Sequence, residues 1–171
     1  MSVREAVASD VPRLLQLVRD LAEYERELDQ VAATGDDFRR LLFPEDGRPT
    51  AFGHVAELDG EVVGMAVWFL SFSTWTGRNG IWLEDLYVMP EHRGSGLGRE
   101  LLATLARLCA ERGYQRLEWW VLDWNEPSVG FYRSLGARPC DEFTTYRLDG
   151  EALAGLAGPG KISGGDAGSR S

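Results

Sequence analysis

The sequence predicts a layered α/β or α+β fold in which helices pack on a mixed β-sheet. Three observations lead to this prediction. Apolar residues recur at helical spacing in some segments and alternate, or run continuously, in others. Three strand-like segments follow one another in the middle of the chain, with turn residues between them. The 171 residues are 44% hydrophobic, which is enough for a buried core.

The N-terminal third is expected to contain one strand and two helices. Residues 2–7 form the strand, and Asp10 is expected to cap a helix that continues to about Arg26, because the apolar residues between them have helical spacing. A second helix is expected to begin near Thr34 and to end at residues 43–47. Its inner face would carry Phe38, Leu41 and Leu42.

The middle of the chain predicts an antiparallel meander. Strands are expected at residues 51–58, 61–72 and 81–89. Asp59-Gly60 separates the first two strands and favours a two-residue turn, because such turns need positive φ. Residues 76–80 contain two glycines and an asparagine and are expected to form the next turn.

The pattern changes after the meander. A glycine-rich loop at Arg93–Gly98 leads into a helix that Gly113 is expected to end. A strand at 117–122, a helix at 125–135 and a last strand at 144–148 are expected to follow. The predicted order of elements is therefore β-α-α-β-β-β-α-β-α-β.

Composition sets further expectations. Residues 1–157 are expected to form a single domain, and residues 158–171 a flexible tail rich in Gly and Ser. The formal net charge of −9 disfavours nucleic acid and anionic membranes as partners. No signal peptide or membrane-spanning segment is recognised, so the expected location is the cytoplasm. His54 and His92 lack partners at metal-ligand spacing, and no metal site is expected.

The loop at Arg93–Gly98 is the most informative segment. Amide groups at a helix N-terminus lack partners inside the helix, and together with the helix dipole they attract an anion such as a phosphate. Glycines let the backbone approach that anion closely. No Lys-Ser or Lys-Thr follows the glycines, as a P-loop would require, and their alternate spacing does not fit the dinucleotide-binding fingerprint. The alternative is that the glycines only form a tight turn.

The loop resembles the acetyl-CoA motif of the GNAT acetyltransferase family, Arg/Gln-x-x-Gly-x-Gly/Ala. Arg93, Gly96 and Gly98 stand at its fixed positions. The segment from Asn125 to Tyr132, followed by Leu-Gly-Ala, is similar to a second signature of the same family.

Two further segments are similar to one branch of that family. They are Leu-Ala-Glu-Tyr-Glu at 21–25 and Leu-Glu-Asp-Leu-Tyr-Val-Met at 83–89. The branch is that of the diamine acetyltransferases, which includes the spermidine/spermine and thialysine enzymes. The resemblance covers about residues 2–157.

The resemblance implies a mixed, mostly antiparallel central sheet with helices on both faces, and acetyl-CoA as cosubstrate. It implies coenzyme contacts from Leu86, Tyr87, Val88, Arg93, Gly94, Ser95, Gly96, Leu97, Gly98, Asn125 and Tyr132. Leu86, Tyr87 and Val88 would offer backbone groups to the pantetheine arm, and the Val88 N–H is the expected donor to the oxyanion. Asn125 could equally act only as a helix cap.

Acetyl transfer to an amine needs a base, because an alkylammonium has a pKa of about 10.4 and is almost fully protonated at neutral pH. Glu84 is the candidate base, acting directly or through water. Tyr132 is the candidate acid for the leaving thiolate, and no covalent enzyme intermediate is required. Asp85 is expected to alternate to the opposite face of the strand and is the weaker candidate. A solvated Glu84 and a core Tyr132 are the alternative interpretations.

The resemblance implies that the substrate is the primary amine of a small cation: a diamine, a polyamine or a thialysine-like amino acid. Candidate substrate contacts are Tyr24, Glu25, Trp75, Glu84 and Asp85. The alternative for Glu25 and Trp75 is an ordinary surface position. A GNAT enzyme that acts on a protein amine or an antibiotic, and an inactive acyl-CoA-binding sensor, remain open. The branch also implies a homodimer, and one of Trp119 and Trp120, expected on opposite faces of a strand, would pack at its interface.

Overall fold

The computed structural model describes residues 1–158. Their contacts form two compact units, Met1–Leu122 and the residues from Asp123 onward. The first unit contains a sheet with the strand order β1-β2-β3-β4-β5. Its strands are β1 (Ser2–Glu5), β2 (Phe52–Leu58), β3 (Glu61–Ser73), β4 (Arg78–Val88) and β5 (Leu117–Glu118). The first four pair antiparallel and β5 pairs parallel to β4, which confirms the mixed, mostly antiparallel sheet.

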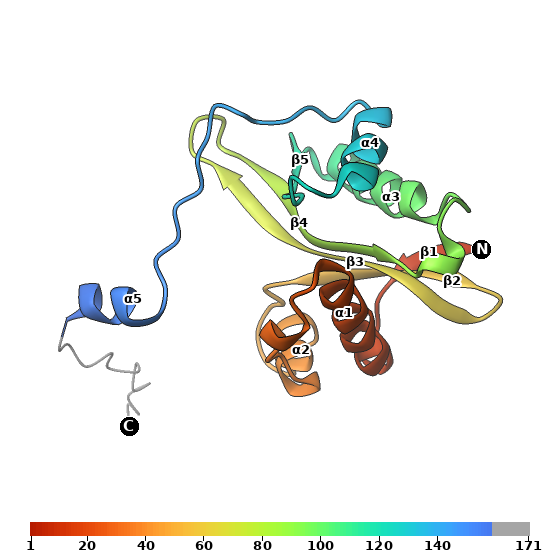
Figure 1. The fold of residues 1–171 in the computed structure, drawn as a ribbon, viewed down its shortest axis with the longest axis horizontal. Helices are drawn as coiled ribbons and strands as arrows, with labels where there is room; N and C mark the ends of the chain where they lie inside the picture. The colour runs from red at the N-terminus through yellow and green to blue at the C-terminus, as the bar shows by residue number, and fades with distance from the viewer. Residues whose placement is uncertain (159–171) are drawn as a thin grey trace, which may run out of the picture. The chain divides into compact units, whose positions relative to one another are not determined.

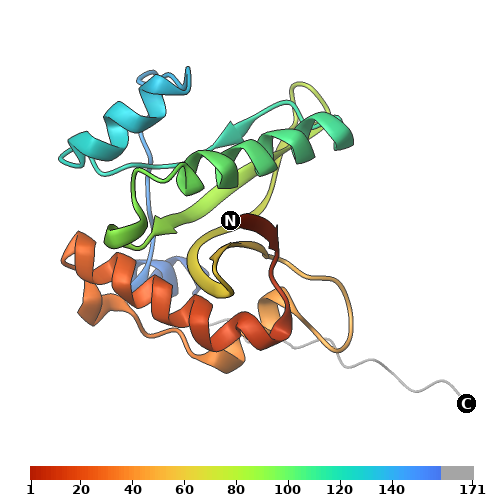
Figure 2. The same ribbon diagram turned by 90° about the vertical axis from the view of Figure 1, so that its right-hand side faces the viewer.

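Helices cover both faces of this sheet (Figure 1). Helices α1 (Val11–Glu25) and α2 (Gly35–Leu42) lie on one face, and α3 (Leu97–Arg112) lies on the other (Figure 2). Short 3₁₀ turns occur at η1 (Ala8–Asp10), η2 (Leu28–Gln30) and η3 (Pro90–His92). The predicted fold class is therefore confirmed.

A hydrophobic core holds α1 against the sheet. Leu14 and Leu17 of α1 are fully buried and share a cluster with Val55, Met65 and Tyr87 of the three central strands. Burial of a leucine side chain contributes about 1.5–3 kcal/mol, so this face fixes the position of α1 over β3 and β4. On the other face, α3 buries leucines at helical spacing: Leu97, Leu101 and Leu105.

Local signals predicted most boundaries correctly. Asp59 and Gly60 have φ values of 52° and 85°, as the two-residue turn between β2 and β3 requires. The Thr34 hydroxyl accepts a hydrogen bond from the Asp37 N–H at 3.2 Å and caps α2. Gly113, with φ of 67°, ends α3. β4 begins at Arg78, before the predicted residue 81, because the turn residues already pair with β3.

Two side chains of the first unit differ from expectation. The Asp10 carboxylate does not cap α1; it accepts hydrogen bonds from the Arg4 guanidinium at 2.6 and 3.0 Å and from the Val7 N–H at 2.8 Å. This charge-assisted bonding is stronger than a neutral cap and ties η1 to β1. Leu41, expected on the inner face of α2, is 42% exposed, whereas Leu42 is buried.

The second unit contains α4 (Glu126–Ser134) and α5 (Gly150–Ala157). The prediction for α4 is confirmed, and α5 was not predicted. The strand predicted at 144–148 is wrong: this segment has no ladder partner among the described residues, and Tyr146 is 92% exposed. β-type residues alone do not make a strand, because each strand needs a neighbour to pair its backbone. The predicted strand at 117–122 is also shorter, since β5 ends at Glu118.

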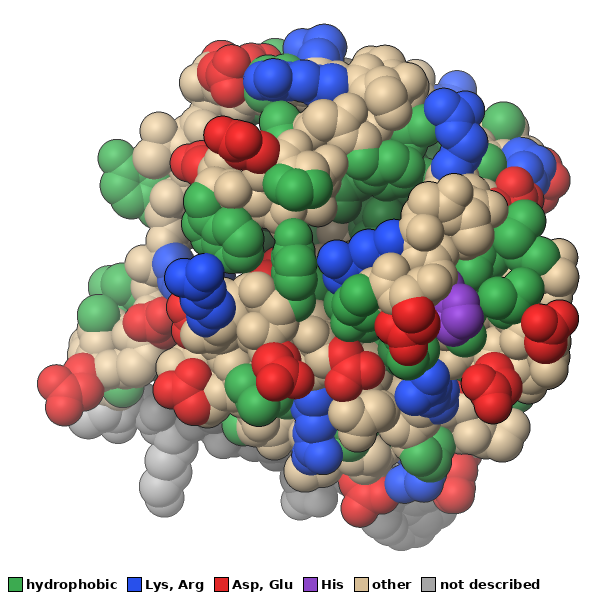
Figure 3. Space-filling view, turned by 45° about the vertical axis from the view of Figure 1, so that its right-hand side comes forward, with side chains coloured by type: hydrophobic (Ala, Val, Ile, Leu, Met, Phe, Trp, Pro, Cys, Tyr) green, Lys and Arg blue, Asp and Glu red, His purple; other side chains and the backbone are tan. Residues whose placement is uncertain are grey.

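Three findings concern the surface charge, the helices and the end of the chain. Acidic and basic side chains are interspersed over the face seen in Figure 3, so the net charge of −9 is not gathered into one patch there. None of the described helices combines the length and the apolar character needed to span a bilayer. The tail predicted at 158–171 lies, apart from its first residue, outside the described residues.

Candidate active site

The glycine-rich loop joins β4, through η3, to the N-terminus of α3. Gly94 and Gly96 have φ values of 77° and 93°, which only glycine adopts readily. The Ser95 hydroxyl donates a hydrogen bond to the His92 carbonyl at 2.6 Å and holds the turn. Within residues 1–158, the backbone N–H groups from 94 to 99 donate no hydrogen bond to the chain. A row of unpaired amides at a helix N-terminus is the arrangement that binds phosphate.

The Arg93 side chain, although exposed, contacts other parts of the first unit. Its Nε–H donates to the Val88 carbonyl at 2.9 Å, and its guanidinium carbon lies 4.8 Å from the ring centre of Tyr24 and 5.5 Å from that of Tyr87. Its backbone N–H donates to the Pro90 carbonyl at 3.2 Å. Arg93 therefore joins the loop to β4 and to α1, and the coenzyme contact expected from it stays a prediction. Tyr24, expected at the substrate, lies against this guanidinium.

The edge of β4 next to the loop is open. Strand β5 pairs only with Ile81 and Trp82, so within the described chain no strand pairs with Leu83–Val88 on that side. The Met89 N–H donates to the Val63 carbonyl on β3 at 3.0 Å. Because backbone groups alternate along a strand, the N–H groups of Val88 and Leu86 point to the open edge. The backbone of Tyr87, by the same alternation, points to β3.

A β-bulge changes the expected direction of the acidic side chains. In the register of β3 and β4, Val67 pairs with Asp85 and Trp68 with Leu83, so Glu84 is the extra residue. Asp85 therefore shares the face of Val67, on which α1 packs. The Glu84 carboxylate accepts a hydrogen bond at 3.2 Å from Nε1 of Trp82, which pairs with Phe69 on the same face. The expectation that Asp85 faces away from Glu84 is wrong, because it assumed unbroken alternation.

Burial and neighbouring charges raise the pKa of Asp85. Desolvation is the main cause, followed by repulsion from Glu84 and Glu25, and together they raise its pKa to about 7. Desolvation, followed by repulsion from Glu27, also raises the pKa of Glu25, the last residue of α1. Of these two carboxyls, that of Asp85 is the more deeply buried. No group in the described chain donates a hydrogen bond to its carboxyl. A cation placed here would relieve this repulsion.

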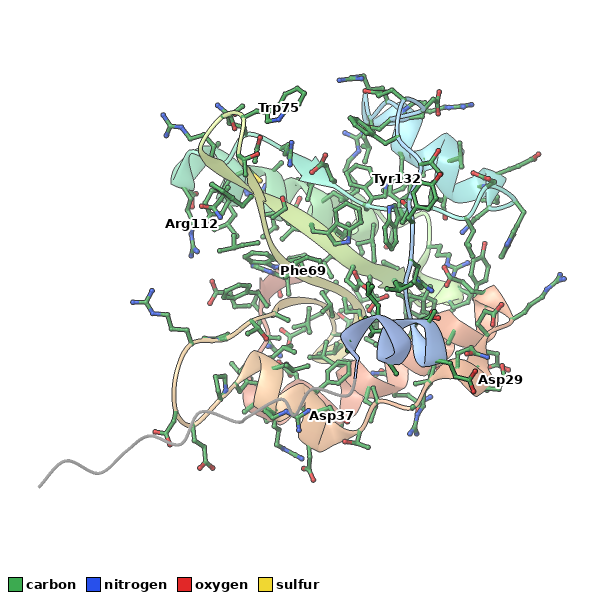
Figure 4. All side chains as sticks on the ribbon, turned by 90° about the vertical axis from the view of Figure 1, so that its left-hand side faces the viewer. Asp29, Asp37, Phe69, Trp75, Arg112 and Tyr132 are labelled. Atoms are coloured by element: carbon green, nitrogen blue, oxygen red, sulfur yellow. The ribbon has the colours of Figure 1, made fainter. Side chains whose placement is uncertain are left out.

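Of the other expected site residues, Trp75 lies far from the acidic group along the sheet, and Asn125 and Tyr132 belong to the second unit. Trp75 is 97% exposed at the tip of the β3–β4 hairpin and points away from the sheet (Figure 4). Along β4 this tip is roughly 20 Å from Asp85, so the two residues do not come together within the chain. In the second unit, the Asn125 side chain accepts a hydrogen bond from the Ser128 N–H at 3.3 Å and caps α4. Tyr132 lies in that helix, with its ring centre 5.3 Å from that of Phe131.

Sequence reasoning missed Trp82. Its signal was its place two residues before Glu84 on a strand, which puts both side chains on one face. It also missed that Trp120 contacts Trp82, with ring centres 4.9 Å apart.

Comparison with known proteins decides the family. A model of the acetyltransferase (GNAT) family matches residues 14–137. The chain belongs to the GNAT family. It is an N-acetyltransferase, and members of this family use acetyl-CoA as cosubstrate.

Individual relatives agree with this assignment. The chain is 40% identical to a thialysine N-epsilon-acetyltransferase of Bos taurus, over 91% of this chain and 96% of that protein. It is 31% identical to spermidine/spermine N(1)-acetyltransferase-like protein 1 of Homo sapiens, over 91% of this chain and 23% of that protein. An integron cassette protein of V. cholerae has the same fold, with a TM-score of 0.76 and 24% identity over 92% of this GNAT chain and 97% of its own.

Proposed function

We propose that this enzyme transfers the acetyl group of acetyl-CoA to the primary amine of a small cationic substrate, by direct attack in a ternary complex. The carrying observation is the group of Glu25, Glu84 and Asp85 on one face of the first unit, where repulsion between carboxylates favours a bound cation. The relatives named above as thialysine and spermidine/spermine-like acetyltransferases support the same substrate class.

The coenzyme fits the loop before α3. The unpaired amides from 94 to 99 and the positive φ of Gly94 and Gly96 suit a pyrophosphate, which would be held by Gly94, Ser95, Gly96, Leu97 and Gly98. The edge-facing N–H groups of Leu86 and Val88 suit the amide groups of the pantetheine arm. We assign the oxyanion to the Val88 N–H. Acetyl-CoA supplies the thioester carbon that the amine attacks.

Proton transfer is proposed for two side chains, Glu84 and Tyr132. The ammonium binds at Asp85 and Glu84, and Glu84 takes its proton directly or through a water molecule. The free amine forms a C–N bond to the acetyl carbon, the C–S bond breaks, and Tyr132 gives a proton to the departing thiolate. The second proton that the nitrogen loses on becoming an amide returns through water to the Tyr132 phenolate. The role of Tyr132, and a pantetheine contact from Asn125, rest on the match to the second signature of the family.

Three broader proposals accompany this function. We propose that residues 1–157 act as one acetyltransferase domain, because the family match at 14–137 extends across both compact units. We propose a homodimer, on the resemblance to the diamine branch alone. We propose a cytoplasmic location, as expected from the sequence.

A thiol-release assay with acetyl-CoA tests the function. The amine panel contains putrescine, spermidine, thialysine, lysine, an aminoglycoside and a peptide with a free N-terminus. Turnover of the small amines, lost in a Glu84→Gln, Asp85→Asn double variant, is the expected result. If only the peptide or the aminoglycoside were acetylated, the proposed class of small cationic substrates would be wrong, and the acetylated compound would identify the class instead. Coenzyme binding without turnover of any amine would identify a sensor.

A further inference from the structure

Three aromatic side chains of the first unit form a continuous surface beside the acidic group. Phe69 of β3 and Trp82 of β4 are cross-strand partners with ring centres 6.4 Å apart. Trp120, just after β5, meets Trp82 edge to face, with ring centres 4.9 Å apart and an angle of 81° between the ring planes. We call Phe69, Trp82 and Trp120 the aromatic shelf.

The shelf is accessible to a ligand. Phe69 is 37% exposed and Trp120 is 59% exposed, which is high for large aromatic side chains. Large aromatic rings that contact one another and still face solvent are typical of binding surfaces. The near-perpendicular rings of Trp82 and Trp120 touch edge to face and form a corner, so a flat ring set against this corner would contact both. The shape therefore favours a planar ligand group.

The shelf is joined to the proposed reaction site at one end. Nε1 of Trp82 donates to the Glu84 carboxylate at 3.2 Å, and Asp85 follows on the same face. Residues two apart on a strand are about 7 Å apart, so an ammonium at the carboxylates and a ring on the shelf would be separated by two or three carbons.

At the other end of the shelf, the acid next to Trp82 in the β-ladder is already ion-paired. This acid is Glu118 of β5. Its carboxylate is bound to Nε of Arg116 at 2.8 Å. A diamine lying along the shelf would place its second charge against aromatic rings and this ion pair. An uncharged, planar group is the better complement.

We infer that the aromatic shelf binds the ring of an arylalkylamine whose ammonium lies at Glu84 and Asp85, so that such monoamines are substrates of this enzyme. The inference rests on the proposed function and extends its substrate class. Stacking on aromatic rings adds affinity for the ring, and the carboxylates hold the charged nitrogen.

The test compares kcat/KM for 2-phenylethylamine, 2-cyclohexylethylamine and putrescine. Trp120→Ala removes one wall of the shelf and leaves the bond between Trp82 and Glu84 intact. We expect the kcat/KM ratio of 2-phenylethylamine to putrescine to fall about tenfold, through KM. The cyclohexyl analogue, which is not planar, should be the poorer substrate of the wild-type enzyme. Trp120→Leu keeps apolar volume in case the alanine variant does not fold, and should lower the ratio in the same direction.

Phe72→Ala is the matched control, because Phe72 is an exposed aromatic residue of β3 on the opposite face from Phe69. It should leave the ratio unchanged. The proposed role of the shelf would be overturned if the enzyme acetylated putrescine but not 2-phenylethylamine, or if Trp120→Ala left the kcat/KM ratio unchanged. Either result would leave the acetyltransferase proposal standing. Turnover of no amine would instead overturn the proposed function. In that case calorimetry would measure the binding of 2-phenylethylamine directly. Weaker binding to Trp120→Ala than to the wild type would support the proposal that the shelf binds the ring, and equal binding would overturn it.

Discussion

Asp85 should set the pH dependence of amine binding. With a pKa of about 7, its carboxyl is about 10% ionised at pH 6 and about 90% ionised at pH 8. An ammonium binds the ionised form, so kcat/KM for a diamine should rise roughly tenfold over this range and then level off. The Asp85→Asn variant keeps the shape of the side chain but cannot ionise. Its profile should have no step near pH 7.

The increase in KM expected for Asp85→Asn at pH 8 follows from the loss of the contact between the substrate ammonium and the Asp85 carboxylate. A hydrogen bond to a charged group contributes about 1.5–3 kcal/mol, which corresponds to roughly 10- to 150-fold in KM. Asp59→Asn is the control, because it removes an equal charge from the exposed turn between β2 and β3 and tolerates positive φ. It should shift KM less than twofold. Steady-state kinetics in a constant-ionic-strength buffer provide the measurement.

The same substitution should stabilise the fold above neutral pH. The folded protein holds the Asp85 proton up to about pH 7, whereas the unfolded chain releases it near the ordinary value of 3.8, so stability is lost as pH rises between these values. The shift corresponds to at most about 4 kcal/mol, and partial solvent access reduces it to about 1–3 kcal/mol.

Asp85→Asn should therefore melt roughly 3–9 °C higher than the wild type at pH 8 and close to it at pH 4. A step near pH 7 that persists in Asp85→Asn, or a lower melting temperature at pH 8, would refute this reasoning.

Three further predictions concern the loop, the acid and the core. Gly96→Ala should weaken acetyl-CoA binding in calorimetry, because the side chain enters the space proposed for the anion, while Gly77→Ala, which also adds a side chain at a positive-φ glycine but in the β3–β4 hairpin, should not. If both variants bound acetyl-CoA with equal affinity, the proposed coenzyme site at this loop would be wrong. Tyr132→Phe should lower kcat by roughly 10- to 1000-fold with little change in acetyl-CoA affinity, and unchanged turnover would exclude its acid role. Burial, more than the nearby Arg112, lowers the pKa of His54, which accepts the Trp68 indole N–H at 3.1 Å, so stability should fall as pH drops below about 6.5. Urea unfolding followed by fluorescence should show this fall in stability in the wild type and a smaller fall in His54→Gln. An equal fall in both proteins would mean that other groups cause it.

The sheet and the loop could be predicted because their signals are local. The Asp59-Gly60 turn, the Thr34 cap and the glycines at 94 and 96 each specify a backbone conformation within a few residues. The acidic group could not be predicted in full, because the bulge at Glu84 is a property of the pairing between β3 and β4. Without that register, period-two alternation puts Asp85 on the wrong face.

The errors near the C-terminus have the same physical origin. Residues 144–148 have β-type composition, but whether they pair depends on the presence of a free neighbouring strand. β5 stops at Glu118 although, within the described residues, the edge of β4 beside it stays unpaired from Leu83 to Val88, and the Trp119–Trp120 pair does not continue the ladder. The function of Arg93 also depends on distant residues, since Tyr24 lies far from it in the sequence.

One consequence of Arg93 concerns local opening. Its guanidinium contacts the final turn of α1 through Tyr24, while its Nε–H is bonded to the end of β4 through Val88. The Arg93 side chain therefore stabilises two segments at once: the last turn of α1, which carries Glu25, and the turn that precedes α3. In hydrogen exchange the two segments should lose protection together, and occupancy of the turn by a nucleotide should slow exchange at the helix end as well.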